Sequence, residues 1–148
     1  MYRRKDNFMD DAKTTVEELK KKVVAFRKAR GWTKEDPKDV ALSLVLEATE
    51  LLEHFQWKTG EEVEKEARLY GPICDELSDV LWWVLVMAER LDIDISKAFE
   101  QKLADNEKKY PAHLFSEDKS DEDKRRAYYK IKAKYRGGHP LAEEKGKG

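Results

Sequence analysis

Two pairs of acidic residues have a spacing that suits metal-assisted or acid–base chemistry. Glu47 and Glu50 are three residues apart, and so are Glu76 and Asp79. In a helix, this spacing places both members of a pair on one side. Each pair also borders a strongly apolar segment, so its carboxylates should lie beside buried surface and be partly desolvated. The sequence therefore predicts two acidic pairs on two neighbouring helices.

Antiparallel packing of these helices would bring the two pairs together. Two like charges about 4 Å apart repel by about 4 kcal/mol at an effective dielectric constant of about 20. Either protons or a hard divalent cation must then neutralise the cluster, and carboxylate oxygens favour Mg²⁺ or Mn²⁺ over zinc. The alternative is that the acids lie on the surface and pair with lysines such as Lys58 and Lys97. We favour the metal, because the segment from 40 to 52 contains no charge except Glu47 and Glu50.

The elements that must position these acids are helices. The 148 residues include only four prolines and seven glycines, and apolar residues recur at steps of three and four. We predict four helices, at 16–30, 37–58, 73–91 and 95–110, and a short fifth helix around Tyr128. The expected fold is an all-α, four-helix bundle. Because the run from 80 to 88 is apolar on every side, we also expect a homodimer or a dimer of dimers.

Composition excludes several other classes of protein. Lys and Arg total 30 against 31 Asp and Glu, so the net charge of −1 argues against a general nucleic-acid coat. Cys74 is the only cysteine, which rules out an intrachain disulfide and fits a reducing, cytoplasmic setting. No apolar run is long enough to span a membrane. We expect one domain at 14–115, a flexible N-terminus at 1–13 and a charged extension at 116–148 that is disordered from 137.

Three strings of the sequence resemble a known family. They are LEATELLEHFQWK at 46–58, DELSDVL at 75–81 and KLADNEKKYPAH at 102–113. In combination they are similar to the all-α nucleoside triphosphate pyrophosphatases of the MazG type, and within them to the single-domain dCTP pyrophosphatase-like branch. Together with Phe26, Arg30 and Trp32, the resemblance spans about 20–115.

The resemblance implies a catalytic metal site and a nucleotide substrate. Its four acids, Glu47, Glu50, Glu76 and Asp79, would hold Mg²⁺ while a water attacks the α-phosphorus, releasing a nucleoside monophosphate and pyrophosphate. It further implies that Lys102, Asn106 and Lys109 contact phosphate and sugar oxygens, and that Trp32, Trp57 and Trp83 form the base pocket. For Trp83, packing in the core is an equal alternative. We do not include His54, because a lone histidine is more often a packing residue than a ligand.

Three functions remain open at this point. The first is a Mg²⁺-dependent pyrophosphohydrolase acting on dCTP or a modified dCTP in nucleotide-pool house-cleaning. The second is a relative that prefers dUTP or accepts many nucleoside triphosphates. The third is a non-catalytic helical module that binds a partner. In the enzymatic cases the expected partners are the nucleotide and a second copy of the chain, with no membrane and no nucleic acid polymer.

Overall fold

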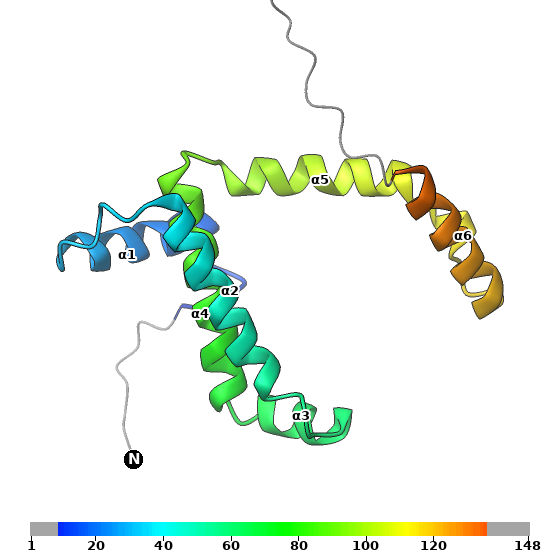
Figure 1. Ribbon diagram of the computed structural model, residues 1–148, viewed down its shortest axis with the longest axis horizontal. Helices are drawn as coiled ribbons and strands as arrows, with labels where there is room; N and C mark the ends of the chain where they lie inside the picture. The colour runs from blue at the N-terminus through cyan, green and yellow to red at the C-terminus, as the bar shows by residue number, and fades with distance from the viewer. Residues whose placement is uncertain (1–8, 136–148) are drawn as a thin grey trace, which may run out of the picture. The chain divides into compact units, whose positions relative to one another are not determined.

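The computed structural model describes residues 9–135, and this part of the chain contains helices and turns without a strand (Figure 1). The helices are α1 (Val16–Lys28), α2 (Pro37–Glu53), α3 (Gly60–Ala67), α4 (Pro72–Arg90), α5 (Ile95–Lys109), the 3₁₀ turn η1 (Ala112–Leu114) and α6 (Asp121–Lys134). The predicted all-α class is confirmed. The chain divides after Ile95 into two compact units, each described by itself below. The flexibility predicted for residues 1–8 and the disorder predicted for 137–148 concern positions outside the described residues.

Capping residues set where the helices begin. Thr15 forms a capping box with Glu18 at the start of α1, and Asp36 accepts a hydrogen bond from the Lys38 N–H ahead of α2. Pro37 occupies the first turn of α2, where no intrahelical donor is lost. The short helix expected around Tyr128 is present as α6, and Ser120 caps it.

The predicted helix at 37–58 is shorter than expected and is followed by one that was not foreseen. After Glu53 the backbone N–H groups bond three residues back, as from Phe55 to Leu52, so the chain tightens into turns. Thr59 then begins α3 with a capping box to Glu62. The spacing of Thr59 and Glu62 is the sequence signal for α3. Because the segment is mostly polar, it lacks the apolar periodicity by which the other helices were predicted.

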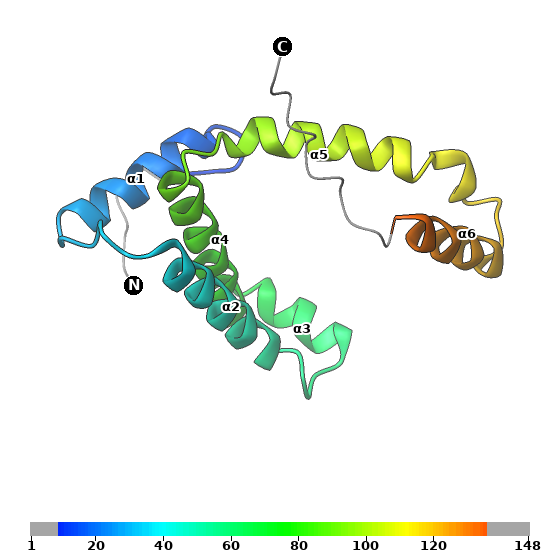
Figure 2. The same cartoon turned by 45° about the horizontal axis from the view of Figure 1, so that its top comes forward.

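Helices α2 and α4 lie side by side and form the centre of the first unit (Figures 1 and 2). Helix α1 packs against α4 as well, and four buried residues fill the space among the three helices: Val23, Val40, Leu85 and Val86. Trp82 and Trp83 pack against this cluster, and the Trp82 ring meets Phe26 edge-on at 5.2 Å. No helix in residues 9–135 is long and apolar enough to cross a bilayer.

Glu35, in the loop between α1 and α2, contacts both α1 and α4. Arg27 on α1 is only 4% exposed, and its Nη2 lies 2.5 Å from Glu35 Oε2. Arg90 on α4 donates from Nε to the Glu35 carbonyl oxygen at 3.1 Å. Burial alone would raise the pKa of Glu35, but the hydrogen bond and charge of Arg27, a backbone hydrogen bond and the charge of Arg90 together lower it. This ion pair therefore orders the entry to α2, the helix that carries the first acidic pair.

The second unit holds α6 to the end of α5 through aromatic rings. Tyr110 stacks on Tyr128 with ring centres 6.1 Å apart, and Phe115 meets Tyr110 edge-on at 6.0 Å. Lys109 lies over the Tyr110 ring, and Lys132 lies over the Tyr128 ring. The tyrosines of the C-terminal segment thus have a packing role in the described structure.

We predict that Glu35→Gln destabilises the protein by about 2 kcal/mol at pH 7, measured by urea unfolding. Breaking a fully buried ion pair costs about 3–5 kcal/mol. The loss here should be smaller, because the Glu35 side chain is 31% exposed. A lowered folded-state pKa stabilises the protein above the ordinary value of 4.5, and this contribution is lost as pH falls through the folded pKa. The difference between wild type and variant should therefore vanish in acid.

The matched control is Glu64→Gln, which breaks an exposed pair with Arg68 on α3. It should cost less than about 0.5 kcal/mol. Equal losses in the two variants at pH 7, or a Glu35→Gln deficit that does not shrink as pH falls below 4.5, would contradict the role given to Glu35.

Candidate active site

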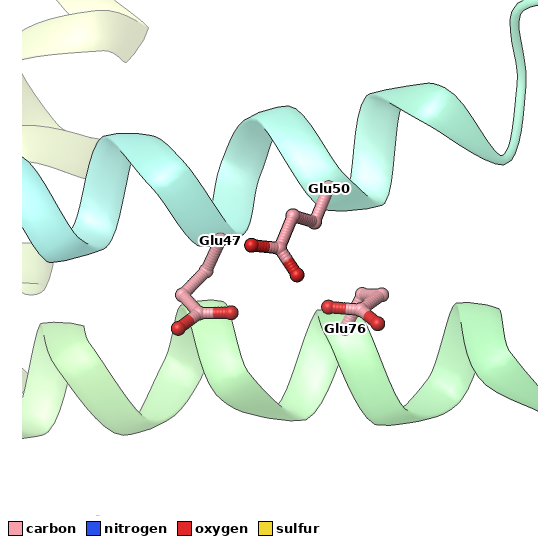
Figure 3. A group of neighbouring side chains, drawn as sticks. All are labelled: Glu47, Glu50 and Glu76. Atoms are coloured by element: carbon pink, nitrogen blue, oxygen red, sulfur yellow. The ribbon is translucent and has the colours of Figure 1, made fainter.

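Three carboxylates from two helices meet in the first unit. Glu47 and Glu50 project from α2 toward α4, where Glu76 faces them (Figure 3). One oxygen from each of the three side chains lies within 4.8 Å of the others. Glu47 and Glu76 are half-buried and Glu50 is exposed, so the cluster sits between the helix interface and solvent. The structure thus brings together three of the four acids that the sequence singled out.

Asp79, the fourth acid, stands at the edge of this cluster. It is exposed, one helical turn beyond Glu76 on α4, and it is not among the three residues whose oxygens meet. Its negative charge nevertheless contributes to raising the pKa of Glu76. Asp79 therefore belongs to the electrostatic environment of the cluster without being one of its three converging carboxylates.

The electrostatics of the cluster favour a positive ion. Desolvation raises the pKa of Glu76, and the charges of Glu50, Asp79 and Glu47 raise it further. A shift of this direction means that negative charge is crowded and incompletely neutralised. Carboxylate oxygens are the donors that Mg²⁺ and Mn²⁺ prefer, so the residues present fit a hard divalent cation.

His54 is a member of this environment that the sequence reasoning left out. It follows Glu50 by four residues at the end of α2, and its charge acts against the upward shift of the Glu76 pKa. The spacing from Glu50 was the available signal, since residues four apart share a helix face.

Lys58, one of the lysines considered as a partner for the four acids, makes a different ion pair. It bonds to Glu66 on α3. Lys58 is therefore engaged with a residue that follows α2. This weakens the alternative in which the clustered acids lie on the surface and pair with Lys58.

The three tryptophans expected in a base pocket occupy different parts of the first unit. Trp57 is 92% exposed in the turn after α2, and Trp32 is 54% exposed beside Phe26. Trp83 is half-buried, and its Nε1–H donates to Glu47 Oε1 at 3.2 Å. Within residues 9–135 no ring contact joins the three to one another. Trp57 and Trp32 thus present free ring surface, whereas Trp83 is engaged with the acidic cluster.

The three polar residues expected to contact phosphate and sugar lie on α5, in the second unit. Lys102, Asn106 and Lys109 are spaced by four and three, so they share one face of that helix. Asn106 and Lys109 are half-buried, and the Lys109 ammonium lies over the rings of Tyr110 and Tyr135. Their contact with substrate stays a prediction.

Comparison with known proteins places the chain in a family. A family model described as the MazG-like family matches residues 42–123, a segment that contains all four acids. The chain belongs to the MazG-like family, as the resemblance of its motifs indicated.

The similar proteins are named as pyrophosphatases. The dCTP pyrophosphatase 1 of Bos taurus is 33% identical over 111 residues, which cover 72% of this chain and 66% of the relative. The protein of the same name from Homo sapiens is 36% identical over 104 residues, covering 68% and 61%. A solved pyrophosphatase from Archaeoglobus fulgidus is 36% identical with a TM-score of 0.60, and the match covers 70% of this chain and 99% of that one. The matches thus span a little under two thirds of the length of the two dCTP pyrophosphatases.

We predict that Glu76→Gln raises the melting temperature in EDTA at pH 7.5, because the substitution removes one of the repelling charges. A raised folded-state pKa costs stability above that pKa and costs nothing below the ordinary value of 4.5. The gain should therefore be full at neutral pH and disappear as pH falls below about 4.5. Differential scanning calorimetry across this range is the measurement.

Added Mg²⁺ should reverse the order of the two proteins. A ligand present at 100 times its dissociation constant stabilises the folded state by about 2.7 kcal/mol, and the variant should lose much of this effect. Glu89→Gln, which changes an exposed acid on the same helix, serves as the control and should match wild type. A Glu76→Gln protein that melts below wild type in EDTA would show that the carboxylates do not repel.

Proposed function

We propose that this protein is a Mg²⁺-dependent nucleoside triphosphate pyrophosphohydrolase that cleaves dCTP or a modified dCTP to the monophosphate and pyrophosphate. The observation that carries the proposal is the convergence of Glu47, Glu50 and Glu76 within 4.8 Å, with the pKa of Glu76 raised. Membership of a family whose relatives are named dCTP pyrophosphatase supports the substrate class. Removal of surplus or modified nucleotides from the pool is the corresponding role.

The carboxylates have two tasks in this reaction. Glu47, Glu50 and Glu76 would hold Mg²⁺, or Mn²⁺ in its place, and Asp79, one helical turn beyond Glu76, would serve as the fourth ligand. A bound divalent ion supplies charge neutralisation for the phosphates and lowers the pKa of water. A carboxylate of the cluster orients and deprotonates the water that attacks the α-phosphorus, and the bond to the α–β bridging oxygen breaks. The products are a nucleoside monophosphate and pyrophosphate.

Residues outside the cluster bind the remainder of the nucleotide. Lys102, Asn106 and Lys109 offer two cations and an amide, which suit phosphate and sugar oxygens. Trp57 presents nearly its whole indole to solvent, which leaves a large apolar ring face open to stacking. A nucleobase stacked on Trp57 would cover that face, and Trp32, with its ring beside Phe26, is the second ring proposed for base contact.

The exposed apolar stripe on α2 and α4 supports self-association as part of the same proposal. At least 46% of each of these side chains is exposed: Leu42, Val45, Leu46, Leu52, Leu77 and Leu81. Large exposed apolar patches are typical of interaction surfaces. We therefore retain the homodimer or dimer of dimers, with 14–115 as the catalytic domain, 116–148 as a charged extension and a reducing, cytoplasmic setting.

The defining experiment is hydrolysis of each dNTP and NTP in water labelled with ¹⁸O, with and without Mg²⁺. We expect dCTP to give dCMP and pyrophosphate with the label in dCMP, because the water attacks the α-phosphorus. Glu47→Gln and Glu50→Gln should each lower kcat by at least about 100-fold, whereas Glu89→Gln should not. Label in pyrophosphate, release of orthophosphate, or no turnover of any nucleotide would refute the proposed reaction.

Substitution of Trp57 tests the base contact separately. Trp57→Ala should raise KM for the preferred nucleotide about tenfold, since stacking of one base contributes about 1–3 kcal/mol. Metal affinity, measured by calorimetry without nucleotide, should stay at the wild-type value. Tyr129→Ala removes an exposed ring from α6 in the second unit and is the control. An unchanged KM across the whole nucleotide panel would remove Trp57 from the pocket.

A further inference from the structure

The side-chain hydrogen bond from Trp83 to Glu47 is not part of the proposed hydrolysis reaction. It joins α4 to α2 over 36 positions of sequence, from the indole Nε1–H to Glu47 Oε1 at 3.2 Å. Both side chains are half-buried, so water competes for this bond less than it would on an open surface. The contact lies directly at one of the three carboxylates that converge in the cluster.

The position of Trp83 on α4 is consistent with a supporting role. It follows Asp79 by four residues and Glu76 by seven, so the three side chains lie along one face of the helix. Its ring packs against the buried cluster of Val23, Val40, Leu85 and Val86. Packing of this kind fixes the direction of the indole N–H, and with it the orientation of the carboxylate that accepts the bond.

The chemistry of the indole suits this task better than a basic side chain would. An indole N–H is a neutral group that donates and never accepts, so it binds a carboxylate without neutralising it. A lysine or arginine in the same place would satisfy the negative charge and compete with a cation. The hydrogen bond uses one of about four lone-pair sites of Glu47, and the others stay available to a metal ion.

We propose that Trp83 is a positioning residue, which holds Glu47 in the orientation that a divalent cation requires, and that it is not a stacking partner for the base. This inference rests on the proposed metal-binding role of Glu47. It assigns the three tryptophans different tasks: Trp57 and Trp32 offer free ring surface, whereas the polar edge of Trp83 is directed at the metal ligand.

The test compares Trp83→Phe with Trp82→Phe in the full-length protein. Both changes replace an indole with a phenyl ring that packs against the same core, but only the first removes the donor to Glu47. Titration with Mn²⁺ and with Mg²⁺, in the absence of nucleotide, should show a dissociation constant about tenfold higher for Trp83→Phe and unchanged for Trp82→Phe. Loss of a hydrogen-bond partner to a metal ligand typically weakens affinity by about 10–100-fold.

A second measurement observes the bond itself. The four tryptophans give four indole N–H signals in a ¹H–¹⁵N correlation spectrum, and Trp83→Phe identifies one of them. We expect that signal to move in Glu47→Ala and on addition of Mg²⁺, while the Trp57 signal stays in place. If Trp83→Phe does not fold, incorporation of benzothienylalanine at position 83 replaces the N–H with sulfur and keeps the ring shape.

The outcomes separate this inference from the proposed function. At saturating metal, the KM of Trp83→Phe for dCTP should equal that of wild type. An unaltered metal affinity, or a KM that changes with the identity of the base at saturating metal, would overturn the positioning role. Because metal affinity is measured without nucleotide, a weakened Mn²⁺ site in a protein that hydrolyses no nucleotide would refute only the proposed function.

Discussion

The constraint on which the candidate site depends is the packing of α2 on α4, which forces like charges together. Val40 lies two helical turns before Glu47 on α2, so the residue that anchors the helix in the core and the acid that reaches the cluster share one face. On α4, Trp83 packs against the same core and follows Glu76 by two helical turns. Because the core holds α2 against α4, the backbone positions that carry the acids stay on facing sides of the two helices. Burial of the core thus holds a repulsive arrangement in place.

Two carboxylates in the first unit show how environment decides the role of a residue. Glu35 has an arginine at 2.5 Å, and its pKa is lowered despite burial. Desolvation, together with the carboxylates nearby, raises the pKa of Glu76. The first is satisfied by the protein and stabilises the chain entry to α2. The second has its charge incompletely compensated, which is the state expected of a group that binds a cation. Opposite shifts in one small unit therefore separate an acid whose charge is paired by the protein from an acid whose charge is left crowded.

Much of this arrangement follows from sequence, and the remainder depends on tertiary register. The three-residue spacing of Glu47 and Glu50, beside apolar residues, was enough to predict their face, because helical periodicity is local. The partner of the Trp83 indole was beyond such reasoning: donation to Glu47 requires that α2 and α4 align at one particular offset. Asp79 shows the same limit, since its spacing from Glu76 predicts the helix face and not its distance from α2. Helix α3 was hidden because its apolar positions are few and only its capping box marks it.

The size of the core explains why charge in this site matters to the whole first unit. Its buried apolar side chains within the described residues are few: Val23, Val40, Ile73, Leu85, Val86 and Ala88. Small domains are stable by only about 5–15 kcal/mol, so repulsion among three carboxylates between α2 and α4 acts directly on a small margin of stability. A conflict of this kind, between local charge and global packing, is typical of functional sites. A bound cation would resolve it, because it would neutralise carboxylates that repel one another between α2 and α4.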